Sequence, residues 1–207
     1  MSKIKRVLIS VSDKQNLKPL LQSLKKNKIE IISSGGTYKE IKKLKFDCTE
    51  VSEFTNSPEI LEGRVKTLHP KIHAGILNKR KNKNHQNDLK RNNFENIDLV
   101  IVNFYPFEKT LNSTNDHKKI IENIDVGGPT MVRAAAKNYN DVTVITSPIQ
   151  YDELIDQLDK NNGSTTLEFR KKMSQIAFTE TAYYDAVISD YFNKVSNTNF
   201  PKKKLFY

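Results

Sequence analysis

The first fifty residues alternate between short apolar runs and longer stretches with helical spacing, and this alternation limits the fold more than any other feature. Apolar runs predict buried strands at 6–10, 29–33 and 47–51. Between them, leucines recur at helical spacing over 15–26, and 38–44 is expected to form a second helix. Strands that alternate with helices through short connections are typical of a parallel sheet with crossover helices.

The remainder of the chain extends this α/β pattern and then becomes helical. The clearest buried strand is predicted at 97–104, and a further strand at 142–146. From 148 to about 192 the pattern is helical, with a break at 161–164. The shorter expected features are a helix that begins at Ser57-Pro58-Glu59, an irregular segment over 63–77, a helix followed by a loop over 78–93, and helices over 118–124 and 129–137.

Length and composition indicate a single globular unit. The 207 residues fit one large α/β domain, which we place at 1–195, with a short basic, linker-like tail at 196–207. Hydrophobic residues make up 37% of the chain, which is too much for a disordered protein. The single cysteine, Cys48, rules out an internal disulfide framework. Because no segment resembles a signal peptide or a membrane span, we predict a cytoplasmic protein with no membrane partner.

The formal charge of +10 would attract anions such as phosphorylated metabolites, nucleic acids or acidic lipids. The lysines are scattered, however, and the densest basic runs, 79–83 and 202–204, have few aromatic residues between them. Nucleic-acid binding would favour clustered basic residues with aromatic stacking platforms. We therefore expect no nucleic-acid partner and take a small anionic ligand as the main hypothesis.

Polar and glycine residues follow three of the predicted strands. In an open parallel sheet, ligands bind beyond the carboxyl ends of the strands, and glycines at a helix N-terminus favour an anion. Each motif alone is also typical of an ordinary cap or turn, so the prediction rests on their coincidence at one edge. These residues are Ser12, Asp13 and Lys14 after the first strand, Ser34, Gly35, Gly36 and Thr37 after the second, and Asn103, Phe104 and Tyr105 after the strand at 97–104.

Two further segments carry chemically useful side chains. The segment 63–70 contains two cations, a hydroxyl and an imidazole between Gly63 and Pro70, which suggests a shaped loop. At 124–129 a glycine turn opens a helix beside Asp125, and Lys137 closes that helix, where a lysine ordinarily complements the helix dipole. We predict no metal site, because the four histidines show no ligand spacing and Pro70 argues against a regular His69–His73 pair.

Seven motifs in this order resemble the N-terminal domain of the bifunctional AICAR transformylase/IMP cyclohydrolase family. The resemblance runs from about residue 6 to at least 146, with a helical continuation to 193. The motifs are 11–14 (VSDK), 34–37 (SGGT), 63–70 (GRVKTLHP), 73–77 (HAGIL), 103–107 (NFYPF), 124–128 (IDVGG) and 133–138 (RAAAKN).

The resemblance implies a methylglyoxal-synthase-like, three-layer α/β/α fold with a mostly parallel sheet and C-terminal helices. It implies closure of the formylated aminoimidazole-carboxamide ribotide to IMP, with loss of water and with no metal or cofactor. It also implies a homodimer, although largely through a domain that this chain lacks. The implied substrate-binding residues are Ser12, Asp13, Lys14, Ser34, Gly35, Gly36, Thr37, Arg64, Val65, Lys66, Thr67, Val102, Asn103, Asp125 and Val126, and the implied catalytic residues are Lys66, Tyr105, Asp125 and Lys137.

These implied roles are chemically reasonable. Lys66 would stabilise the oxyanion that develops on the formyl oxygen. Asp125 would take or orient the amide proton, and Tyr105 and Lys137 would donate or shuttle protons. Family members normally continue into a transformylase domain, and this chain ends where that linker would start. We therefore expect no formyltransferase activity and interpret the chain as an excised fragment, a truncated product or a stand-alone cyclohydrolase.

Three alternatives stay open at this point. A non-catalytic nucleotide sensor would keep the phosphate loop but would not need Lys66, Asp125 and Lys137 together. Methylglyoxal synthase also binds a phosphate, but the motifs at 64–70 and 103–107 do not belong to that enzyme. Nucleic-acid binding would show a steep dependence of affinity on salt.

Overall fold

The structure is a computed structural model, and it describes residues 3–198. Its centre is one five-stranded sheet in the order β3-β2-β1-β4-β5, in which every neighbouring pair is parallel. The predicted parallel sheet is therefore confirmed, and the order places β1 beside β4, where the direction of chain progression reverses. The strands are β1 (Arg6–Val11), β2 (Glu30–Ser33), β3 (Thr49–Glu50), β4 (Leu99–Asn103) and β5 (Thr143–Ile145).

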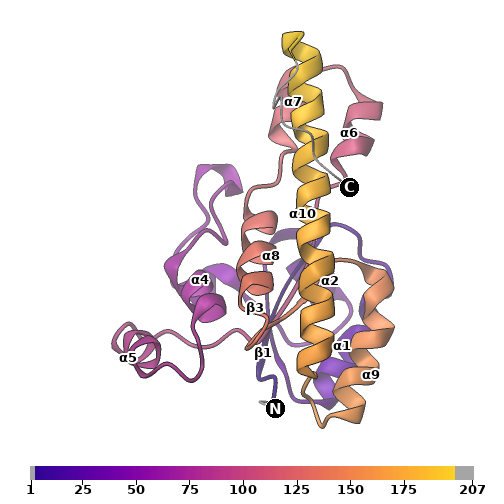
Figure 1. Cartoon of the computed structure of the whole chain (residues 1–207). Coiled ribbons are helices and arrows are strands. Elements are labelled where there is room, and N and C mark those ends of the chain that lie inside the picture. Colours follow the sequence, from indigo (N-terminus) through magenta and orange to yellow (C-terminus); the bar gives the residue numbers. More distant parts are fainter. Residues whose placement is uncertain (1–2, 199–207) are drawn as a thin grey trace.

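Helices cover both sides of the sheet, which confirms the predicted three-layer α/β/α arrangement. On one side α8 packs against both α4 and α10, and elsewhere α1 packs against α9 (Figure 1). The helices are α1 (Leu17–Lys26), α2 (Gly35–Lys43), α3 (Val51–Thr55), α4 (Pro70–Leu77), α5 (Lys83–Arg91), α6 (Phe107–Ser113), α7 (His117–Glu122), α8 (Gly127–Lys137), α9 (Tyr151–Lys160) and α10 (Leu167–Ser196), with short 3-10 turns η1 (Leu61–Gly63) and η2 (Pro148–Gln150).

The apolar side chains form two clusters. The larger one fills both sides of the sheet and includes Leu8, Ile9 and Val100, which are fully buried. The smaller one gathers Phe107, Ile120 and Tyr184 where α6 and α7 pack around the C-terminal half of α10 (Figure 1). At 30 residues, α10 is about 45 Å long, so it connects the main core with this second cluster.

Several predictions in the first half of the chain are wrong in their boundaries. The strand predicted at 47–51 is only Thr49–Glu50, and α3 already begins at Val51. The glycines at 34–37 are not a loop before a helix, because α2 already begins at Gly35 with Ser34 as its N-cap. The segment 63–77 is not irregular throughout, because α4 begins at Pro70. Proline is tolerated at this first helical position, because an N–H there would have no partner within the helix. The His69 side chain caps the helix by accepting the Lys71 N–H.

The order of helix and loop after α4 also differs from the prediction. Residues 78–93 begin with a loop and end with α5, since the Asn82 side chain accepts the N–H groups of Asn84 and His85 and so caps the helix there. The helix expected at 57–59 is absent from that described segment. Asn56 ends α3 in the left-handed conformation (φ 56°), and η1 follows instead.

The end of the chain is described only in part. The helical prediction to about 192 is confirmed, and α10 continues to Ser196. Of the predicted tail, 199–207 lies outside the described residues, so the division of the chain at 195 stays a prediction. Within residues 3–198, no helix combines the length and the apolar character needed to cross a membrane.

Candidate functional site at the carboxyl ends of the strands

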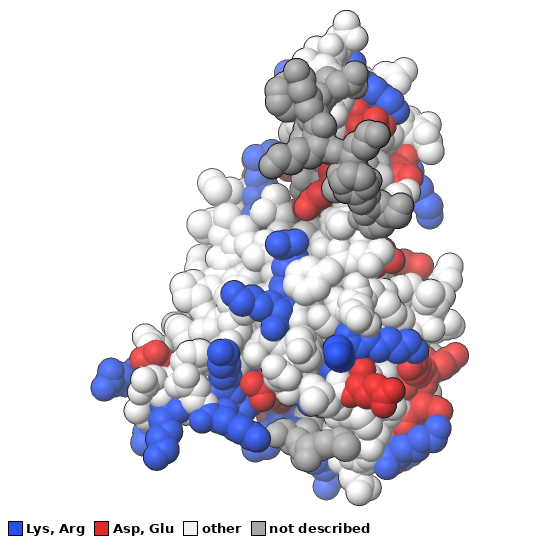
Figure 2. Space-filling view, in the orientation of Figure 1, with Lys and Arg blue, Asp and Glu red and all other residues white. Residues whose placement is uncertain are grey.

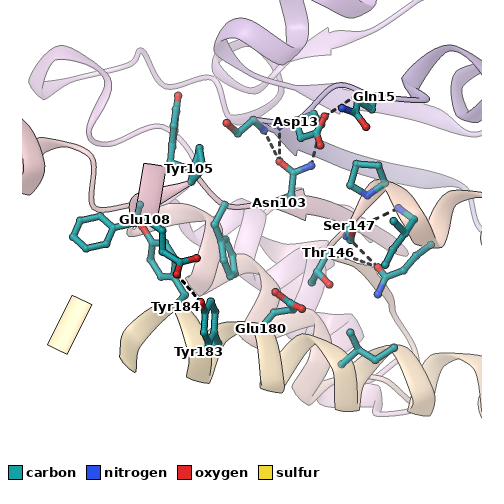
Figure 3. A pocket seen from close by; sticks show the side chains of 18 of the residues that line it. Asp13, Gln15, Asn103, Tyr105, Glu108, Thr146, Ser147, Glu180, Tyr183 and Tyr184 are labelled. Carbon is teal, nitrogen blue, oxygen red and sulfur yellow. Dashed lines mark hydrogen bonds between the residues drawn. The ribbon is translucent and has the colours of Figure 1, made fainter. Parts of the chain in front are cut away.

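The Asn103 side chain joins the ends of β1 and β4. Its Oδ1 accepts the N–H groups of Ser12 (2.6 Å) and Asp13 (2.9 Å), and its Nδ2 donates to the Asp13 carbonyl (3.0 Å) (Figure 3). The two strands are neighbours, so their exits lie side by side once the sheet forms. Asn103 therefore shapes the backbone at the point where the strand order reverses, which is where ligands bind in open parallel sheets.

The N-terminus of α2 is attached to the same place. Thr37 Oγ1 accepts the Val11 N–H (2.9 Å) and donates to the Val11 carbonyl (3.0 Å), which fastens the first turn of α2 to the end of β1. Helical hydrogen bonding in α2 begins only at Tyr38, whose N–H reaches the Ser34 carbonyl. The preceding amides have no acceptor within the helix, and they form the positive end of its dipole. This turn is suited to an anion such as a phosphate.

The Lys66 ammonium lies beside this helix terminus. Its Nζ pairs with Glu59 Oε2 at 3.2 Å, and a β carbon added to Gly35 would lie 3.4 Å from the same Nζ. The side chain folds over Gly63, where an added β carbon would lie 2.6 Å from Lys66 Cε. Gly63 also has a φ of +87°, which only glycine adopts without strain. The glycine is thus required both by the backbone and by the position of Lys66.

Two glycines at the start of α8 bring Thr67 and Asp125 to the site. A β carbon on Gly127 would lie 2.7 Å from Thr67 Oγ1, and one on Gly128 would lie 2.3 Å from Asp125 Oδ2. Asp125 Oδ1 accepts the Gly128 N–H at 2.9 Å. Burial raises the pKa of the Asp125 carboxyl above its usual range, and the Gly128 hydrogen bond opposes that rise. The carboxylate is therefore a better proton acceptor than an exposed one.

The remaining predicted site residues differ in their exposure to solvent and in their contacts. Tyr105 is 58% exposed and Val126 is 59% exposed, so both reach solvent beside the site. Arg64 is exposed and forms an ion pair with Glu122. Val102 is buried within β4, so its side chain cannot contact a ligand. Val65 is half-buried and pairs with Ile60 in a short antiparallel bridge, and the Lys14 ammonium donates to the Ser12 carbonyl at 3.2 Å.

Lys137 is not brought to the same place. It follows Gly127 by ten residues of α8, about 15 Å at 1.5 Å per residue. The next residue, Asn138, donates to the Asn78 carbonyl at 2.9 Å, just beyond the C-terminus of α4. Asp141 in turn accepts the Arg80 N–H, and Arg80 pairs with Asp98 just before β4. Lys137 therefore lies towards the amino ends of the strands, on the opposite edge of the sheet from Asp125.

A cavity of about 750 Å³ adjoins the strand ends on the other side of Asn103 (Figure 3). Ser12 and Asn103 line it, and it extends past Ser147 at the exit of β5 to Glu180 on α10. Among the described residues that line it, none belongs to 34–37, 64–67 or 125–128. The cavity and the candidate site are thus neighbours that share one wall.

Tyr184 contacts this site from α10, and no motif in the sequence indicates that role. Its hydroxyl accepts the backbone N–H of Asp125 at 2.8 Å across 59 positions of sequence. The only signal in the sequence is an apolar helical face, which does not show which polar atom such a face meets. Within residues 3–198, no group of three or more His, Cys, Asp or Glu side chains is arranged to hold a metal ion.

On the face shown in Figure 2, the positive charge does not form one continuous binding surface. Basic side chains are spread over several elements and are interrupted by acidic ones (Figure 2). Around α5, Lys79, Lys81, Lys90 and Arg91 are exposed. Of the large apolar side chains that are exposed in the described part of the chain, none lies between 78 and 104. This basic region therefore offers no stacking platform for bases.

Comparison with known proteins agrees with this fold. The MGS-like domain family matches residues 16–130, more than half of the chain, and the chain belongs to that family. A family described as the AICARFT/IMPCHase bienzyme matches residues 135–206.

Curated relatives carry the name bifunctional purine biosynthesis protein PurH. The protein from Rhizobium rhizogenes is 43% identical over 202 residues, which are 98% of this chain and 38% of that protein. The protein from Oceanobacillus iheyensis is 45% identical over 199 residues, 96% of this chain and 39% of that protein. The chain thus spans less than two-fifths of the length of these relatives. Among solved structures, the crystal structure of ForH superimposes with a TM-score of 0.81 at 29% identity, covering 91% of this chain and 99% of that one.

Proposed function

We propose that this chain is an IMP cyclohydrolase, which closes the ring of 5-formamidoimidazole-4-carboxamide ribotide to give IMP and water. The observation that carries the proposal is that residues 66 and 67 connect the N-terminus of α2 with the glycine turn beside Asp125. Lys66 Nζ lies beside Gly35 of α2, and the neighbouring Thr67 hydroxyl packs on Gly127, next to the glycine that Asp125 covers. The similarity to the PurH proteins over nearly the whole chain supports the same assignment.

The α2 terminus would bind the 5′-phosphate of the ribotide. The amides of Gly35, Gly36 and Thr37 point to the anion, and Lys14 and Ser12 stand at the neighbouring exit of β1. The base would then lie over the ends of β1 and β4, between Asn103 and the N-terminus of α8. In this pose the reacting groups of the base reach Lys66 and Asp125.

The chemistry needs orientation, a base and charge stabilisation. The carboxamide nitrogen attacks the formyl carbon and forms the new C–N bond while its proton passes to Asp125. The formyl oxygen gains negative charge, which the Lys66 ammonium stabilises until this oxygen is protonated to a hydroxyl. The hydroxyl then takes the proton held by Asp125 and leaves as water, while the formamide nitrogen loses its own proton, which restores the proton donor, and forms the C=N bond. The exposed Tyr105 hydroxyl is the proposed proton donor. Because nucleophile and electrophile belong to one molecule, no cofactor is required, and orientation alone can contribute about 7 kcal/mol or more.

Lys137 does not fit this scheme within one chain, because a lysine side chain does not span the distance from the far end of α8. A direct role would require a second copy of the chain to present it. The homodimer is therefore part of the proposal only in that form, and light scattering of the purified chain measures it. The proposal concerns ring closure alone, because the matched MGS-like domain covers residues 16–130 and the chain spans 38% of the PurH protein from Rhizobium rhizogenes.

A comparison of nucleotide and nucleoside binding tests whether the N-terminus of α2 binds the phosphate. We expect IMP, titrated into the chain in a calorimeter, to bind with micromolar affinity, and the nucleoside inosine to bind at least about 100-fold more weakly, because it lacks the charged group that the α2 terminus receives. Equal affinities for IMP and inosine would contradict the phosphate assignment. Tight binding of IMP without any turnover of the formylated ribotide would instead support a nucleotide sensor.

A single methyl group on Gly128 is expected to displace the catalytic carboxylate. In Gly128→Ala the new β carbon would overlap Asp125 Oδ2, so the carboxylate must move by about 1 Å, and we expect kcat to fall about 100-fold. Arg133→Ala, on an exposed position of the same helix, is the control and should keep kcat within a factor of two. Steady-state kinetics of both variants, with thermal unfolding measured alongside, checks the prediction. A Gly128→Ala variant with normal kcat would show that the carboxylate position does not matter.

A further inference from the structure

The Tyr184 side chain on α10 bonds directly to the segment that carries Asp125. Its hydroxyl accepts the Asp125 N–H at 2.8 Å, while the Asp125 carboxylate is held from the other side by the Gly128 N–H at 2.9 Å. Tyr184 is only 7% exposed. The backbone and the side chain of Asp125 are therefore fixed by two separate hydrogen bonds from two different helices.

The ring of Tyr184 also holds the turn that carries Tyr105. It packs on Phe104 with ring centroids 5.0 Å apart and on Phe107 with centroids 6.3 Å apart. These two phenylalanines flank Tyr105 on either side in the sequence, and Phe107 is buried. One side chain thus contacts both segments that would supply the base and the proton donor.

The neighbouring Tyr183 shows what a purely peripheral tyrosine does on the same helix. Its hydroxyl donates to Glu108 Oε1 at 2.7 Å, and the residue is 53% exposed (Figure 3). It contacts neither Asp125 nor Phe104 through any hydrogen bond or ring pair among the described residues. The two adjacent tyrosines therefore form a matched pair for an experiment.

We propose that Tyr184 is a positioning residue for ring closure: it holds the Asp125 backbone in place and clamps the Phe104–Phe107 turn so that the carboxylate and the Tyr105 hydroxyl face the same substrate. This inference deepens the proposed cyclohydrolase function and rests on it. Burial keeps the pKa of Tyr184 raised, so its neutral phenol can accept the Asp125 N–H throughout the neutral pH range.

The test compares Tyr184→Phe with Tyr183→Phe in the full chain. Removing the Tyr184 hydroxyl leaves the Asp125 N–H without its partner, and we expect kcat to fall about tenfold with KM unchanged within a factor of two. The loosened carboxylate becomes better hydrated, so the acid limb of the kcat–pH profile should move to lower pH. Tyr183→Phe should change neither quantity.

A second readout separates failure of this inference from failure of the proposed function. The titration of the Asp125 carboxyl, followed by carbon-13 NMR, needs no turnover, and its pKa should be lower in Tyr184→Phe than in the unmodified chain. If the unmodified chain does not form IMP, the proposed function fails, whatever the tyrosine does. If Tyr184→Phe only lowers the unfolding temperature, with kcat, the pH profile and the Asp125 pKa all unchanged, the residue is structural and the inference is overturned.

Discussion

Asp125→Asn is expected to lower kcat for IMP formation by about 1,000-fold, because the amide keeps the shape of the carboxylate but cannot accept the proton of the attacking nitrogen. Affinity for IMP should change by less than about threefold, since proton transfer is complete in the product and its remaining ring N–H can donate to the oxygen of either an aspartate or an asparagine. Pre-steady-state and steady-state measurements of IMP formation, with IMP binding measured on the same preparation, check both parts. Normal turnover in Asp125→Asn would remove the base from the mechanism.

The raised pKa of Asp125 predicts that kcat of the unmodified chain falls at acid pH. Burial raises the pKa of Asp125, so the ionised, active form is lost as the pH falls through a value above the ordinary carboxyl pKa of about 3.9. The kcat of the unmodified chain should therefore show an acid limb at that raised value, and Asp125→Asn should lack it. A raised pKa in the folded state also means that ionised Asp125 opposes folding. The unfolding free energy at neutral pH should consequently be no lower in Asp125→Asn, which excludes unfolding as the cause of lost activity.

Lys66→Met is the second substitution with a large expected effect. Methionine keeps most of the apolar stem but removes the charge that would stabilise the formyl oxyanion, and we expect kcat to fall about 100- to 1,000-fold. Loss of the Lys66–Glu59 ion pair should change stability little, because both side chains are about a third exposed and such pairs contribute about 1 kcal/mol or less.

Lys71→Met is the matched control for Lys66→Met. Lys71 lies on α4, close in sequence, and its ammonium stands 4.7 Å from the centre of the Phe54 ring rather than at the strand ends. We expect its kcat to stay within a factor of two. If both lysine variants lost the same activity, the effect would be one of general charge, and a specific oxyanion role for Lys66 would be wrong.

The strand-end part of the site could be predicted from the sequence because it follows from topology. Parallel strands leave their carboxyl ends at one edge, so Ser12, Thr37 and Asn103 had to converge once the β-α-β pattern was recognised. Hydrogen bonds such as that from the Asp13 N–H to Asn103 Oδ1 then join these strand ends.

The parts that the sequence did not predict depend on distance along helices and on packing. Lys137 stands in a motif with neighbours that suggest a site, yet a helix of 11 residues carries it to the opposite edge of the sheet. Tyr184 contributes one hydroxyl to a backbone N–H 59 positions away, and no periodicity reveals such a contact. The early start of α2 does not follow from the sequence, because two glycines ordinarily favour a turn. Here Thr37 bonds to β1 and fixes the two glycines as the first helical turn.

We propose that this chain by itself closes the purine ring at the ends of β1, β2 and β4. The most direct measurement mixes the purified chain with 5-formamidoimidazole-4-carboxamide ribotide, without folate or any other addition, and follows IMP by its absorbance. We predict that the unmodified chain converts all of the ribotide to IMP over many turnovers. The Lys66→Met, Asp125→Asn double variant should form IMP no faster than the uncatalysed reaction. An unmodified chain that binds IMP but forms it no faster than the double variant would contradict the claim.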